Sequence, residues 1–149
     1  MAFVFWVMTS RKLLGFKVEK PTGQSDANLQ ACEQGLVLDR VRAHSLADLP
    51  WQIDAETLSR VEAFGYRLGE AFALISDPDA EDINIRALVV HPQARGQGQG
   101  ARLIKALFAN YPDKTWHVPA IFPEEMSSMF EQAGMQPETL SQWQMVCKL

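Results

Sequence analysis

The sequence predicts a single domain of the α/β class. Its length of 149 residues is that of one ordinary domain. Apolar residues make up 47% and charged residues 21%, values typical of globular proteins, which excludes disorder and a coiled-coil rod. Short stretches with the residue preferences of strands also alternate with stretches of helical spacing along the chain.

Charge and cysteine usage narrow the expected partners. The formal net charge of -4 predicts that the protein as a whole does not bind nucleic acid. Cys32 and Cys147 are far apart and match neither a disulfide framework nor zinc-ligand spacing, so we expect no metal and a reducing, cytoplasmic compartment. No apolar run approaches the roughly 20 residues of a membrane helix, so we expect no membrane span.

The first elements are predicted to be strands. Residues 2–8 are rich in aromatic and β-branched side chains, which favours a buried strand. A second strand is expected over 12–19, after a turn over 9–11. An apolar strand here would be an exposed edge if it were unpaired, so a homodimer through residues 2–8 is a hypothesis.

A loop and a helix are predicted next. Proline, glycine and aspartate mark 21–26 as a loop. Ser25 or Asp26 could cap a helix that begins near Ala27. Residues 36–43 either continue that helix or form a strand.

The middle of the chain is predicted to hold one helix and two strands. A helix is expected within 46–64, because Ser45 and Asp48 have the spacing of a capping box. Residues 67–76 and 83–91 are predicted as strands, with a turn over 77–79 between them.

Helical spacing is clearest in the second half. One helix is predicted from Ala101 to Asn110, followed by a short strand over 115–118. The apolar face of a later helix is formed by Met126, Met129, Phe130 and Ala133, and Gly134 ends it. A closing strand is expected over 143–147.

The most informative segment is 89–102, where a predicted strand runs into a glycine-rich turn and then into a helix. Three glycines at alternate positions within 96–100 allow close backbone approach to a ligand. Unpaired amides and the dipole at a helix start favour anions, which predicts a cradle for phosphate or diphosphate. Arg95 and Arg102 would add cationic donors. The segment matches neither the Gly-Lys-Ser/Thr ending of a P-loop nor Rossmann glycine spacing.

This segment resembles the signature of a known family. Arg95-Gly96-Gln97-Gly98-Gln99-Gly100 is similar to the R/Q-x-x-G-x-G/A motif of the GNAT superfamily of N-acetyltransferases. The flanking Val90-His91-Pro92 and Ala101-Arg102-Leu103 also fit, and the segment from Met129 to Met135 resembles the family's late helix. The resemblance covers about residues 68–148. It implies one GNAT-like domain over 1–149, with a mixed, mostly antiparallel sheet flanked by helices.

The resemblance also implies a reaction. Acetyl-CoA would be the donor and a primary amine, small or peptide, the acceptor, with direct attack and no metal. An amide near Val89 would act as the oxyanion donor to the thioester carbonyl. The residues implied for cofactor binding are Leu88, Val89 and Val90 on the strand, and Arg95, Gly96, Gln97, Gly98, Gln99, Gly100 and Ala101 in the turn and helix start.

Catalytic side chains are less clearly indicated. Phe130 occupies the position where the family often has a tyrosine acid, and its helical spacing favours a place in the core. His117 is a candidate general base, although a structural histidine is commoner. The acidic turn over 77–82 either attracts a cationic amine or is a solvated hairpin tip. A non-catalytic sensor or regulator that binds CoA or acyl-CoA is therefore the alternative function.

The first half departs from the family pattern. Members usually open with a strand and two helices, followed by a hairpin that leads into the cofactor strand. Residues 41–50 resemble that opening, as a strand feeding the first helix. Residues 1–35 would then be an N-terminal addition.

Overall fold

A computed structural model describes residues 7–44 and 54–148, with side chains over 12–44 and 54–139. Its strands are β1 (Val7–Glu19), β2 (Gln30–Cys32), β3 (Phe64–Leu68), β4 (Ala71–Ile75), β5 (Asp82–Val90), β6 (Thr115–Pro123) and β7 (Gln136–Lys148). Its helices are α1 (Gln34–His44), α2 (Ala55–Leu58), α3 (Gln99–Asn110) and α4 (Ser127–Gln132), with short 3-10 turns η2 (Pro92–Ala94) and η3 (Glu124–Met126). None of the helices described is long and apolar enough to cross a membrane.

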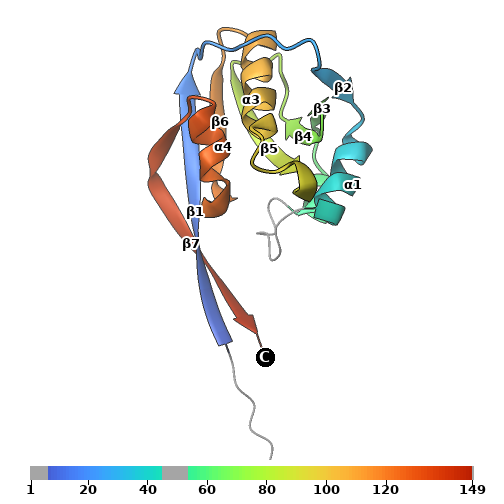
Figure 1. Ribbon diagram of the computed structural model, residues 1–149. Coiled ribbons are helices and arrows are strands. Elements are labelled where there is room, and N and C mark those ends of the chain that lie inside the picture. The colour runs from blue at the N-terminus through green and yellow to red at the C-terminus, as the bar shows by residue number, and fades with distance from the viewer. Residues whose placement is uncertain (1–6, 45–53, 149) are drawn as a thin grey trace, which may run out of the picture.

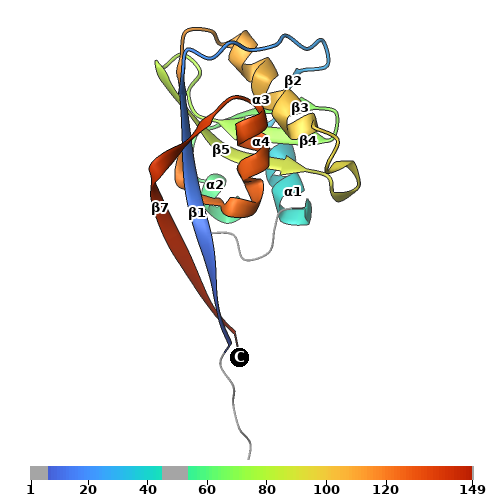
Figure 2. The same cartoon turned by 60° about the vertical axis from the view of Figure 1, so that its left-hand side comes forward.

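The strands form one mixed sheet in the order β2-β3-β4-β5-β6-β1-β7. All neighbours are antiparallel except β5 and β6, which run parallel. Helices cover both faces, with α3 and α4 on the side opposite α1 (Figures 1 and 2). The predicted fold class, an α/β domain with a mostly antiparallel sheet flanked by helices, is confirmed.

Two apolar clusters fill the space between the sheet and its helices. The larger contains Leu103 and Leu107 from α3 and Phe130 from α4. The smaller contains Val37 and Val41 from α1 and packs on the other face. The alternating side chains of β5 are divided between the two clusters, so this strand is buried on both faces and is a rigid support for groups at its ends.

The predicted turn over 9–11 is wrong. β1 is one continuous strand of 13 residues, because each residue from Val7 to Leu14 has a partner on β7. β1 also pairs with β6, and together with β7 it extends beyond the rest of the sheet (Figure 2). Val7 and Met8 pair within the same chain, and residues 2–6 of the predicted dimer strand lie outside the described residues.

The predicted helix from Ala27 is also wrong. Residues 30–32 form β2, because they pair with β3 from Gln30 opposite Arg67 to Cys32 opposite Gly65. Asp26 accepts a hydrogen bond from the Asn28 amide in a local turn, so it does not cap a helix.

Residues 36–43 belong to α1, which resolves the ambiguity between helix and strand. The proposed opening strand over 41–50 is therefore wrong for 41–44, which are helical, and the rest of that segment lies outside the described residues. The helix predicted within 46–64 is the four-residue α2, whose Thr57 amide donates to the Asp54 carboxylate. Ser45 and Asp48 lie outside the part of the chain that is described.

The prediction of one strand over 67–76 is wrong, because these residues form the end of β3, a turn and β4. β3 and β4 meet at Gly69, which has a φ of +58° that favours glycine. The strands predicted over 115–118 and 143–147 are both present and longer than expected, because β6 continues to Pro123 and β7 begins at Gln136. Gly134, with a φ of +94°, follows α4 as expected.

Candidate functional site

β5 and β6 separate along most of their length. They pair only from Asp82 opposite Thr115 to Asn84 opposite His117. β5 then continues to Val90 and β6 to Pro123, with no further pairing between these described residues. The later part of β5 therefore has a free backbone edge that faces β6.

Backbone hydrogen bonding alternates along β5, and this alternation decides which residues have their amides on the free edge. The His91 amide donates to the Glu70 carbonyl at 3.0 Å, and the pairing with β4 is unbroken from Val90 back to Ala87. Successive residues of an antiparallel strand direct their backbone groups to opposite sides. The amide of Val89, like that of His91, faces β4, and those of Leu88 and Val90 face the gap. The amide of Val89 itself therefore does not face the gap, whereas the amides on either side of it do.

At the end of β5 the chain enters the glycine-rich turn. Gly96 and Gly98 have φ values of +81° and +76°, in the left-handed region that glycine adopts readily. A Cβ atom added at either position would meet nothing within 4 Å. The turn therefore presents open space next to its backbone.

Gly98 is the N-cap of α3, and no side chain caps the helix. The first bond of the helix is donated by the Arg102 amide to the Gly98 carbonyl at 3.0 Å. The amides of Gln99, Gly100 and Ala101 precede this bond and have no partner within the helix. Together with the helix dipole they favour an anion at this end.

A pocket of about 220 Å³ lies between this turn and α4. A Cβ at Gly100 would lie 2.6 Å from the Met129 sulfur, so glycine lets α4 approach the start of α3. Of the residues predicted for the cofactor, Val90, Arg95, Gly96, Gly98, Gln99, Gly100 and Ala101 line the pocket, whereas Leu88, Val89 and Gln97 do not.

The wall formed by α4 was not predicted as part of this site. Glu125, Ser128 and Gln132 line the pocket with Met129. Their spacing of three and four residues puts these polar groups on one side of η3 and α4, beside the apolar side that faces the core. That spacing is the sequence signal that would have identified them.

The two arginines near the turn are bound to other parts of the protein. Arg95 donates to the Val90 carbonyl at 3.1 Å and to the carbonyl of His44, so it links the turn to the end of α1. Arg102 is ion-paired with Asp26 at 2.7 Å. Both guanidinium groups, which were expected to add cationic donors at the turn, therefore have partners within the protein.

The candidate catalytic side chains lie away from the turn. His117 is opposite Asn84 on β5, and its Nε2 is 2.8 Å from the Asp82 carboxylate. Phe130 is fully buried between Phe16 and Phe122, with ring centroids 5.2 and 5.6 Å away, which confirms the expected place in the core.

This arrangement of sheet, gap and turn has relatives among solved structures. The chain superposes on a putative GNAT-family acetyltransferase from Novosphingobium aromaticivorans with a TM-score of 0.59 and 18% identity, over 95% of this chain and 72% of that one. The chain has the GNAT fold. GCN5-related N-acetyltransferases from Sphaerobacter thermophilus and Kribbella flavida give TM-scores of 0.58 and 0.56, at 12% and 14% identity.

The match covers 93% and 91% of this chain but only 51% and 58% of the Sphaerobacter and Kribbella proteins, respectively. The chain thus spans little more than half of these two neighbours. No family model and no curated protein sequence matches it.

The GNAT order of strand, two helices, hairpin and cofactor strand corresponds to β2, α1, α2, β3–β4 and β5. The opening strand expected within 41–50 is thus at 30–32. β1 precedes this order and lies between β6 and β7, so it is an integral part of the sheet.

Proposed function

We propose that the protein is an N-acetyltransferase that takes the acetyl group from acetyl-CoA and transfers it to a primary amine by direct attack. The observation that carries the proposal is the free edge of β5, which leads directly to the uncapped start of α3 and its adjacent pocket. An extended donor molecule with a diphosphate needs such a combination of backbone edge and anion cradle.

The residues fit the cofactor in two ways. The open space beside Gly96 and Gly98 leaves their backbone accessible to a ligand, and the amides from Gly96 to Ala101 would hold the diphosphate. Leu88 and Val90 offer backbone groups to the pantetheine arm along the gap. Bound acetyl-CoA supplies an activated thioester, and the Leu88 amide is the proposed donor to its carbonyl oxygen.

We assign the proton transfer from the amine to His117. Its hydrogen bond to Asp82 orients the ring, as a carboxylate partner commonly does for a general base. Its partner on β5, Asn84, is four residues from Leu88, or about 13 Å along the strand. The proton would therefore reach His117 through water.

One observation favours the alternative of a CoA-binding or acyl-CoA-binding regulator without catalysis. Phe130, at the position where the family often has a tyrosine, is buried and has no ionisable proton to donate. The hydroxyls of Tyr66 and Tyr111 are hydrogen-bonded to each other, and burial raises the pKa of Tyr66, which makes the Tyr66 hydroxyl a poor acid. The departing thiolate would then leave without an acid from these three side chains, which slows transfer.

Two measurements test the proposal and separate it from the alternative. A CoA-dependent rise in melting temperature tests binding. Release of free thiol from acetyl-CoA, followed with and without a panel of small and peptide amines, tests transfer. Binding with amine-dependent thiol release supports the acetyltransferase, and binding without release supports the regulator. A melting temperature that CoA does not change contradicts both.

A further inference from the structure

A second pocket lies at β5, on residues distinct from those of the first. It has a volume of about 350 Å³, and the residues that line it include Glu62, Ser76, Asp77, Asp82, Asn84 and Arg86. This volume is within the range of small-molecule sites. Nothing in the proposed cofactor site uses these residues.

Arg86 lies in a β-bulge. Leu74 pairs with Ala87 and Ile75 with Ile85, so Arg86 is the extra residue on β5 with no partner on β4. Bulges of this kind redirect a side chain and are common beside active sites. Here the bulge brings the Arg86 side chain to the wall of the second pocket.

The Arg86 Nε group is inaccessible to solvent and has no hydrogen-bond partner among the described residues. Almost all buried N–H groups in proteins are paired, because a lone one loses its bond to water without replacement. A ligand atom in the pocket cannot touch an Nε that solvent does not reach. A ligand would instead be bound by the terminal nitrogens of the same guanidinium, which can donate two parallel hydrogen bonds to a carboxylate.

The other charged side chains in the wall of this pocket favour a positively charged ligand. Glu62, Asp77 and Asp82 contribute three carboxylates against the single guanidinium of Arg86. The Asn84 amide donates to the Ser76 hydroxyl at 2.8 Å, and the Ser76 amide donates to the Asn84 carbonyl at 3.0 Å, which joins the two strands that form the wall. A ligand that matches these charges carries cationic amines and one carboxylate.

The pocket adjoins the gap between β5 and β6. The gap opens just after Asn84, and Arg86 is two residues from Leu88, or about 7 Å along the strand. A ligand held beside Arg86 is thus close to the proposed position of the thioester. His117 is hydrogen-bonded to Asp82, which is one of the residues that line the pocket.

We propose that this pocket binds the acceptor and that the acceptor is an amino acid with a basic side chain, its carboxylate on Arg86 and its ammonium groups on the acidic side chains. The assignment of the ligand as acceptor rests on the proposed acetyltransferase function. The binding preference itself follows from the pocket alone.

Lysine and cadaverine test this preference, because they differ only by the carboxylate. We expect the protein, with CoA present, to bind lysine at least about tenfold more tightly than cadaverine in calorimetric titration, as a charge-assisted pair predicts. Without a role for Arg86, the acidic wall would favour cadaverine, which has the larger positive charge. The sign of the preference is therefore diagnostic.

Arg86→Gln should abolish or reverse the preference, whereas Glu62→Gln should weaken both ligands and keep the preference for lysine. Equal or tighter binding of cadaverine to the unaltered protein, binding of neither amine, or a lysine preference that survives Arg86→Gln would overturn the inference. The comparison on the unaltered protein needs no variant to fold. A normal CoA-dependent melting shift without amine binding counts against this inference alone, and amine binding without a CoA shift counts against the acetyltransferase alone.

Discussion

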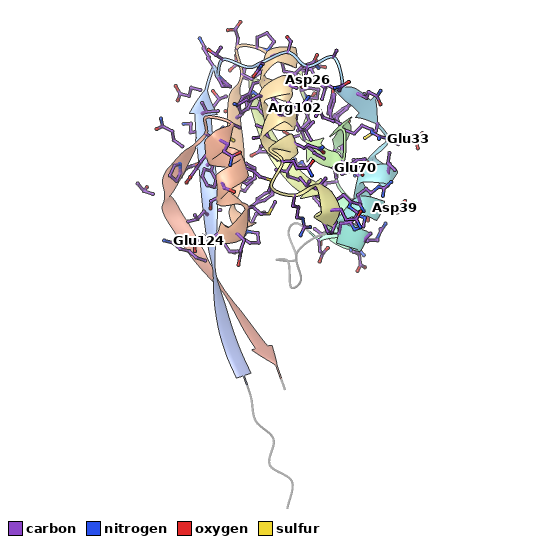
Figure 3. All side chains as sticks on the ribbon, viewed as in Figure 1. Asp26, Glu33, Asp39, Glu70, Arg102 and Glu124 are labelled. Carbon is purple, nitrogen blue, oxygen red and sulfur yellow. The ribbon has the colours of Figure 1, made fainter. Side chains whose placement is uncertain are left out.

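Asp26, in the loop before β2, forms an ion pair with Arg102 on α3, with 2.7 Å between the carboxylate oxygen and the guanidinium nitrogen. The two residues are 76 positions apart in sequence and lie side by side next to the helix (Figure 3). The same loop also places the Gln24 amide 3.1 Å from the Lys105 carbonyl. The loop thus fixes the helix whose first turn forms the candidate anion cradle.

Asp26→Asn should lower the melting temperature at neutral pH and have little effect in acid. The Asn28 amide, and then Arg102, hold the pKa of the Asp26 carboxyl below its ordinary value. A carboxylate with a depressed pKa stabilises the fold above its unfolded pKa, and this contribution is lost as the pH falls through the folded value. The difference between the two proteins should therefore shrink below about pH 4. A difference that is the same at neutral and acidic pH would contradict the prediction.

Gly23→Ala should destabilise the protein by roughly 1–3 kcal/mol in urea unfolding. A Cβ at Gly23 would lie 2.2 Å from the Ala109 nitrogen and 2.6 Å from the Lys105 carbonyl oxygen, both backbone atoms of α3 that cannot move aside. Gly35→Ala is the matched control, because a Cβ there meets nothing within 4 Å and lies in α1. Because Gly35 is the second residue of α1 and not an interior one, alanine there should change the stability by no more than about 0.5 kcal/mol. Equal effects of the two changes would show that the close contact is not what matters.

Gly98→Asp should abolish the CoA-dependent melting shift, and Gly98→Asn should retain more of it. Both side chains have the same shape and tolerate the left-handed backbone of Gly98 better than most residues do. Only aspartate adds a negative charge where the diphosphate is proposed to lie. The comparison thus isolates charge from strain. Equal CoA shifts in the two variants would mean that no anion binds at this turn.

Phe130→Tyr should destabilise the fold by roughly 1–3 kcal/mol and give no gain in transfer rate. The side chain is fully buried, so the added hydroxyl would lose its bond to water among aromatic rings. Phe64→Tyr is the control, because Phe64 is 37% exposed and its hydroxyl would reach solvent, with an effect within about 0.5 kcal/mol. A faster enzyme of unchanged stability would instead put residue 130 at the reacting thioester.

His117→Gln should lower kcat/KM for the amine by roughly 10²–10⁴-fold and leave CoA binding unchanged. Glutamine keeps hydrogen-bonding capacity toward Asp82 but cannot act as a general base. The CoA-dependent melting shift checks that the cradle is intact. A kcat/KM equal to that of the unaltered protein would mean that His117 has no catalytic role.

The parts predicted correctly from the sequence are those that depend on neighbouring residues. The glycine spacing in 96–100 and the apolar spacing of α3 indicated a turn followed by a helix, and both are present. Glycine tolerance of left-handed backbone and helical periodicity are local properties, so a short stretch of sequence is enough to predict them. The resemblance carried by the same stretch led to the correct fold.

The parts that the sequence did not predict depend on partners far along the chain. Whether 30–32 is helix or strand was decided by pairing with β3, and the continuity of β1 was decided by β7, more than a hundred residues later. The ion pair that occupies Arg102 and the bulge that turns Arg86 to the second pocket also arise from contacts across the sheet and its helices. Such contacts gain their energy from bringing distant segments together, and no local pattern specifies which segments those are.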